Sequence, residues 1–188
     1  MPILAATTFL AFALTARSGA ESLPPGEVDF GEFSPPSSGG EFVEVNLGSN
    51  LISLAAHFAP KEQKEVASLL NSLQLVRVNV IGLDDGNRDE LKNRAQKIQQ
   101  HLKAEGWERI VTAKKKDQDV GIHIKMRGTN SVAGVAVIVI DGDHQAVFIN
   151  IVGDVKPEQL ALLGEQLNID PLKKLGPPNR KEKSETDK

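Results

Sequence analysis

The chain has 188 residues, a formal net charge of -3 at pH 7 and no cysteine. Its length fits one domain with extended ends. The mild acidity argues against a nucleic-acid-binding protein, which normally presents a basic face. The absence of cysteine excludes disulfide bonds, thiolate metal sites, a cysteine nucleophile and a lipid anchor attached to cysteine.

The first twenty residues resemble a secretory signal peptide. An uncharged apolar run over residues 3–14 is followed by small residues at Ser18 and Ala20, ahead of a predicted cut before Glu21. The run is too short to span a bilayer. No Lys or Arg precedes it, so an atypical leader, a start upstream of the first methionine and a buried N-terminal helix stay open. We predict a leader over residues 1–20 and an exported product, periplasmic or extracellular and soluble after cleavage.

Composition divides the rest of the chain into three parts. Residues 21–40 are rich in Pro, Gly and Ser and predict a mobile linker, although Phe30 and Phe33 could dock on a surface. Residues 176–188 have no large apolar side chain and predict a disordered charged tail. The folded domain is therefore expected over residues 41–175.

The sequence pattern in the first half of this domain predicts both strands and helices. Loose alternation predicts a strand over residues 41–47, and helical spacing of apolar residues predicts two helices over 51–58 and 60–73. Residues 74–81 alternate strictly and predict a half-buried strand.

A longer helix is predicted after this strand. Asn87 and Glu90 have the spacing of a capping box, and Gly106 is placed to end the helix before Trp107. Its buried stripe is expected to contain Leu91, Ala95, Ile98 and Leu102.

Four short strands follow, separated by turn-rich connections, and a closing helix begins at Pro157. This order predicts an α+β fold in two layers: a mostly antiparallel sheet, built from a four-strand meander and one or two N-terminal strands, with the helices on one face. The meander strands are expected over residues 108–114, 120–126, 131–140 and 146–152.

The third meander strand, Val132–Ile140, is apolar on both faces. Helices on one face of the sheet would leave its second face to be covered by something else. The first strand, the Phe-bearing linker, a second copy of the chain or a partner protein could cover it, or the strand could simply be shielded by its own neighbours in the sheet.

The segment from Asp141 to His144 is the one place where carboxylates and an imidazole lie close together in sequence. Asp141 and Asp143 could bind a hard cation together with His144, and metal-assisted hydrolysis is the alternative function that this set suggests. The other interpretation is a tight hairpin turn, because Asp-Gly readily adopts the required backbone angles.

No further catalytic motif is present in the sequence. It contains neither a zinc-binding HExxH pattern, nor a nucleophile-elbow serine, nor a phosphate-binding loop. We therefore expect no cofactor and no enzymatic activity.

Three segments resemble the bacterial family called domain of unknown function 4252. They are Leu73–Val78 after a leucine-bearing helix, the helix stop at Gly106-Trp107, and Val147–Asp154 leading into Glu158-Gln159-Leu160. The resemblance covers residues 51–163 and implies an exported protein with no established activity, so no site residue is transferred. Relatives encoded near extracytoplasmic sigma-factor systems imply a role in envelope signalling. Many relatives resemble lipoproteins, whereas this chain lacks the anchoring cysteine.

Together these features predict a non-catalytic, exported binding or protein-interaction module of the bacterial cell envelope. Its expected partner is another envelope protein or a second copy, bound through the sheet face around Val132–Ile140. We expect no nucleic-acid partner and no membrane span in the mature chain. A structural envelope protein whose tail binds a partner is a further possibility.

Overall fold

The structure is a computed structural model that describes residues 23–166 except 61, 116–117 and 157–158. The predicted leader, residues 1–20, and the predicted tail, residues 176–188, lie outside the described residues. The described helices include none that is long and apolar enough to cross a membrane.

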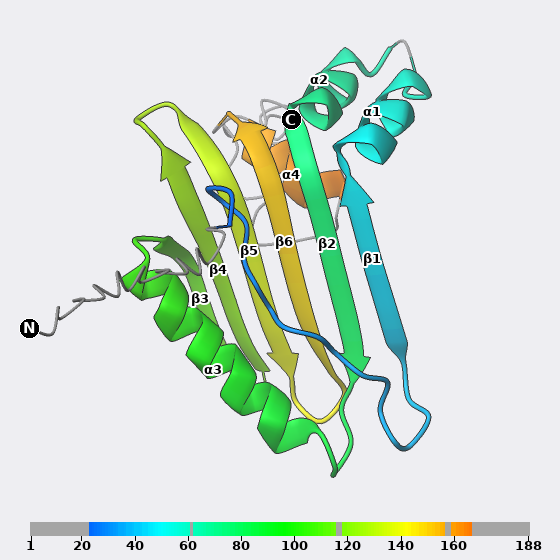
Figure 1. Ribbon diagram of the computed structural model, residues 1–188, viewed down its shortest axis with the longest axis vertical. Coiled ribbons are helices and arrows are strands. Elements are labelled where there is room, and N and C mark those ends of the chain that lie inside the picture. Colours follow the sequence, from blue (N-terminus) through cyan, green and yellow to red (C-terminus); the bar gives the residue numbers. More distant parts are fainter. Residues whose placement is uncertain (1–22, 61, 116–117, 157–158, 167–188) are drawn as a thin grey trace, which may run out of the picture.

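Six strands and four helices make up the described part of the chain (Figure 1). The strands are β1 Phe42–Gly48, β2 Leu73–Gly82, β3 Glu108–Lys115, β4 Gln118–Arg127, β5 Ser131–Asp141 and β6 Gln145–Val155. The helices are α1 Ser49–His57, α2 Lys64–Ser72, α3 Arg88–Ala104 and α4 Gln159–Gln166.

The strands form one antiparallel sheet in the order β1-β2-β6-β5-β4-β3. Strands β3 to β6 follow one another as a meander, and β1 and β2 extend the sheet beyond β6. The predicted α+β class, the antiparallel sheet and its meander are therefore confirmed.

Helix α3 forms where the apolar stripe predicts it. Leu91, Ala95, Ile98 and Leu102 are all buried. The helix ends at Gly106, whose φ of 77° suits glycine, and the N–H of Trp107 donates back to the carbonyl of Leu102 at 2.9 Å. The predicted capping box is wrong, because Asn87 makes no side-chain cap; its amide instead donates to the carbonyl of Gly82 at 2.9 Å.

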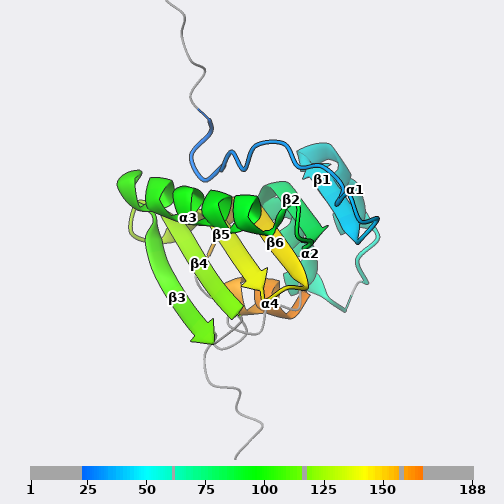
Figure 2. The ribbon, with the colours of Figure 1, turned by 90° about the horizontal axis from the view of Figure 1, so that it is seen from below.

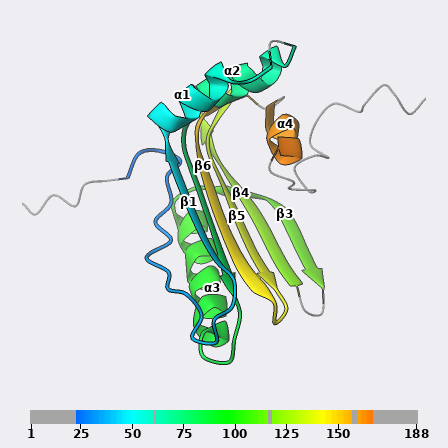
Figure 3. The same ribbon diagram turned by 90° about the vertical axis from the view of Figure 1, so that its right-hand side faces the viewer.

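The helices lie on both faces of the sheet, and not on one face as the sequence predicts. Helix α3 packs on one face, whereas α4 lies on the opposite, concave side, with α1 and α2 at one end of the sheet (Figures 2 and 3). Two separate core clusters result, one around α3 and one that contains Leu160 of α4. The physical reason is that β5 and β6 are apolar on both faces, so each face needs a cover.

The segment predicted as a mobile linker, residues 21–40, packs against the sheet over its described part. Residues 23–40, here called the strap, run across the α3 face (Figure 1). Val28 and Phe30 are 3% and 5% exposed and belong to the α3-side core, and the Phe33 ring lies 4.9 Å from the ring of Phe148 on β6. Composition alone suggested a linker, but these apolar side chains bury enough surface to fix the segment.

Candidate functional site

The segment from Asp141 to His144 forms the tight turn between β5 and β6. The N–H of His144 donates to the carbonyl of Asp141 at 2.9 Å, and Gly142 has a φ of 55°. The geometry of a hairpin turn thus accounts for Asp141 and Gly142.

The carboxylates of this turn engage different partners. Asp141 accepts a hydrogen bond from the side-chain amide of Gln118 at 3.3 Å, and Asp143 forms an ion pair with Arg88 at 3.0 Å. Across the described residues, no three His, Asp or Glu side chains are grouped so that they could hold a metal ion. The structure therefore does not assemble Asp141, Asp143 and His144 into the cation site that their sequence spacing suggested.

His123, on β4 beneath α3, is the one buried histidine among the described residues, at 2% exposure. Burial, together with the positive charge of Arg109, lowers the pKa of His123 to about 4. The imidazole is therefore neutral near pH 7. Its Nδ1 atom has no hydrogen-bond partner among the described residues.

A hollow of about 300 Å³ lies between α3 and one end of strands β3 to β5. Its lining includes Lys92, Gln96, Lys114 and Asp119, and the last two side chains are 3.4 Å apart. These side chains, of which Lys92 and Asp119 are half-buried and Gln96 and Lys114 exposed, include no nucleophile beside a base, so the hollow shows no catalytic arrangement.

The clearest candidate for a binding site is on the other face of the sheet. Strand register places six aliphatic side chains in one row across all six strands, at the end of the sheet away from α1 and α2. We call this row the apolar band; it consists of Val43, Val80, Val147, Val139, Val120 and Ala113.

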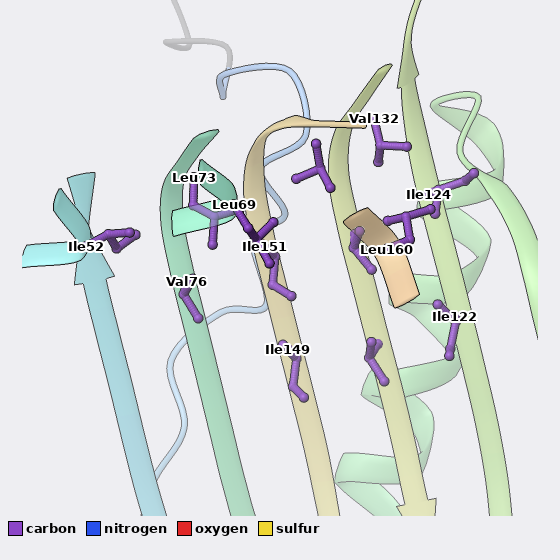
Figure 4. Packing of buried hydrophobic residues seen from close by; sticks show 13 residues of the cluster. Ile52, Leu69, Leu73, Val76, Ile122, Ile124, Val132, Ile149, Ile151 and Leu160 are labelled. Carbon is purple, nitrogen blue, oxygen red and sulfur yellow. The ribbon is translucent and has the colours of Figure 1, made fainter. Parts of the chain in front are cut away.

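The apolar band is only partly covered by the described residues. Val43 is 39% exposed, and the other five members are of intermediate exposure. In the adjacent row, closer to α4, Ile149, Val137 and Ile122 are 8%, 2% and 0% exposed. Figure 4 shows that the buried cluster gathers near α4 on this face.

Polar side chains border the band on its other side. Gln145, Asp141 and Gln118 occupy neighbouring positions in the next row of the sheet. The band is thus a strip of rigid aliphatic side chains with a buried core on one side and a polar rim on the other. The aliphatic side chains of the band can hold an apolar group but provide no acid–base chemistry, and hydrogen-bonding groups are offered by the rim alone.

The predicted interaction face around Val132–Ile140 is mostly internal. Residues 132–138 of β5 are buried, because α3 and the strap cover one face and the α4-side cluster covers the other. Val139 is the residue of this segment that reaches the apolar band. Sequence reasoning missed the band because its members come from six strands, although the alternation in β2 and β4 had shown which of their valines share a face.

Of the comparisons with known proteins, the one with family models finds a match. No curated protein and no solved structure matches the chain. The family described as "Domain of unknown function (DUF4252)" matches residues 38–163, which is more than half of the chain and spans every strand of the sheet. The chain therefore belongs to the DUF4252 family, as the resemblance in its sequence implied.

Proposed function

We propose that the protein is a non-catalytic binding module of the bacterial cell envelope, and that the apolar band binds an apolar segment of a partner protein. The observation that supports this is the row of six partly exposed aliphatic side chains on the α4 face. The leader-like residues 1–20 and the exported relatives that the family resemblance implies support the location in the envelope. A role in envelope signalling rests on that resemblance alone.

The chemistry of the band favours a protein segment with aliphatic or aromatic side chains. Five of its six members are valines, whose branched side chains have few rotamers, so little conformational entropy is lost when they are covered. Each contact would gain free energy from removing apolar surface from water. The polar rim at Gln145 and Gln118 could then hydrogen-bond the backbone of the bound segment.

Isosteric polar substitutions test this proposal. In the double variant Val139→Thr, Val147→Thr the shape of the band is nearly kept, while two hydroxyl groups are placed in it. We expect the wild-type full-length mature chain to bind the apolar dye bis-ANS, and the double variant to bind it about tenfold more weakly, a loss of about 1.4 kcal/mol.

Val66→Thr is the matched control, because it makes the same chemical change on α2, outside the band. It should leave dye binding unchanged. A wild-type chain that binds no dye, or a double variant that binds it as well as the wild type, would overturn the assignment of the band.

A further inference from the structure

The two edges of the sheet differ in how they are protected. Strand β3, at one edge, contains Arg109 and Lys114, and such charges discourage an edge strand from pairing with another chain. Strand β1, at the other edge, contains Glu44 as its single charged residue and no proline. The β1 edge therefore lacks most of the features that prevent strand pairing.

Large apolar side chains are exposed on β1. Val43 and Leu47 are 39% and 37% exposed, and the burial pattern of the strand contains no buried residue. Both side chains point to the α4 face, because they lie opposite Val80 and Val76 of β2. An exposed, apolar edge of this kind is stabilised when another strand extends the sheet.

Helix α1 continues this apolar surface from the end of β1. Leu51 and Leu54 of this helix and Phe58 at its C-cap are spaced three and four residues apart and are 55%, 53% and 80% exposed. Its inner side is also apolar, with Ile52 and Ala56 buried. A helix that is apolar on both sides is normally covered on both sides, so α1 and β1 together indicate an interface.

The sequence of β1 is complementary to itself when two copies run antiparallel about Val45. Val45 then lies opposite Val45 of the partner subunit, and Val43 lies opposite Leu47 of the partner subunit. On the other face, Glu44 lies opposite Asn46 of the partner subunit, so no like charges meet. Centring the pairing on Glu44 would instead place two glutamates side by side, which is unfavourable.

We propose that two copies of the chain pair through β1, antiparallel and centred on Val45, and form one continuous sheet. The contact is isologous, as a two-fold axis requires, because the same surface of each copy faces the other. Because α1 directly follows β1, one α1 helix lies at each end of the paired strands. There its exposed apolar side chains can pack against the other copy. This surface shares Val43 alone with the apolar band, so the pairing does not depend on the proposed partner-binding function.

The mass of the full-length mature chain in solution, measured by light scattering during size exclusion, tests the pairing. We expect a dimer for the wild type. Val45→Lys should be monomeric at the same concentration, because it places two lysines opposite each other at the centre of the pair. Thr112→Lys introduces the same charge on the exposed face of β3, at the opposite edge, and should stay dimeric. The Val139→Thr, Val147→Thr variant should also stay dimeric, which separates this test from that of the band.

Cysteine cross-linking gives the register independently, because the chain has no native cysteine. Val45→Cys should form a disulfide-linked dimer on mild oxidation, since directly opposite residues come within disulfide range. Glu44→Cys is the matched control and should remain mostly unlinked, because its counterpart lies two positions away along the pair. A monomeric wild type, equal effects of Val45→Lys and Thr112→Lys, or equal cross-linking of the two cysteine variants would overturn the proposal.

Discussion

The side chain of Asn150 on β6 accepts a hydrogen bond from the backbone N–H of Val28 in the strap, at 2.9 Å. The same amide donates to the carbonyl of Gly26 at 2.9 Å and to that of Val135 on β5 at 3.2 Å. Asn150 is completely buried, so it pairs strap backbone groups that would otherwise lose their water without gaining a partner. The strap is therefore an integral part of the α3-side core.

Replacing Asn150 with leucine should destabilise the protein strongly. The change leaves the N–H of Val28 and the carbonyl of Gly26 buried without partners, and we expect the free energy of unfolding to fall by roughly 3 kcal/mol. Urea denaturation of wild type and variant measures this. Asn93→Leu, an exposed position on α3, is the control with the same chemical change. A loss for Asn150→Leu no larger than that of the control would show that the amide does not hold the strap.

Gly134 on β5 should be intolerant of alanine. A Cβ atom at this position would overlap the backbone of Gly26 in the strap. We expect Gly134→Ala to lower the free energy of unfolding by about 2 kcal/mol and to release the strap from the sheet. Hydrogen exchange of residues 24–36 should then increase.

Gly48→Ala is the control for this variant, because a Cβ atom there meets nothing within 4 Å. It should leave hydrogen exchange in the strap unchanged. Unaltered exchange in Gly134→Ala would contradict the close approach of the two backbones.

His123 should make stability depend on pH. Its pKa is about 4 in the folded protein and about 6.5 when unfolded, because burial and Arg109 disfavour the charged form. Between these values the unfolded state binds more protons, so the free energy of unfolding should fall as the pH is lowered from about 6.5 to 4. The full effect is at most roughly 3 kcal/mol and is complete below about pH 4.

Carboxylates also make the free energy of unfolding fall as the pH is lowered. A variant is therefore needed to separate the contribution of His123 from theirs. The pKa of Asp84 is lowered, chiefly because its carboxylate accepts a hydrogen bond from the backbone N–H of Ser38, and its contribution is lost as the pH falls through that pKa. His123→Gln should have a flatter stability profile between pH 4 and 6.5 than the wild type. Parallel profiles would show that His123 takes up its proton in the folded state as easily as when unfolded.

Local sequence patterns predicted the elements of this fold better than their arrangement. Helix α3 and the meander strands appear close to their expected residues, because apolar spacing is a local property of the chain. Phe30 and Phe33 left docking of the strap open, but its anchor, Asn150, lies 122 residues from Val28, so the sequence did not predict which residues the strap contacts. The alternation of apolar and polar residues in β2 and β4 likewise predicted which side chains share a face, but not which strands lie beside them in the sheet.

The candidate site was less predictable than the fold for the same reason. The Asp141–His144 segment attracted attention because its polar residues are adjacent in sequence, yet the turn directs its carboxylates to Gln118 and Arg88. The members of the apolar band are, in contrast, distant in sequence and adjacent in the folded sheet. Val43 and Val147 are far apart in the chain and become members of one row only when strand order and register are known.

Site-specific photo-cross-linking in cells of the native host tests the central proposal, that the apolar band binds a partner protein, most directly. A photoreactive phenylalanine analogue at position 147 would replace Val147 within the band, and the same analogue at Gln96, on the α3 side of the protein, would serve as the control. Our account predicts a cross-linked adduct with a defined envelope protein from position 147 only, identified by mass spectrometry and weakened by Val139→Thr. Cross-links from position 147 that stay within the chain, or the same adducts from both positions, would contradict it.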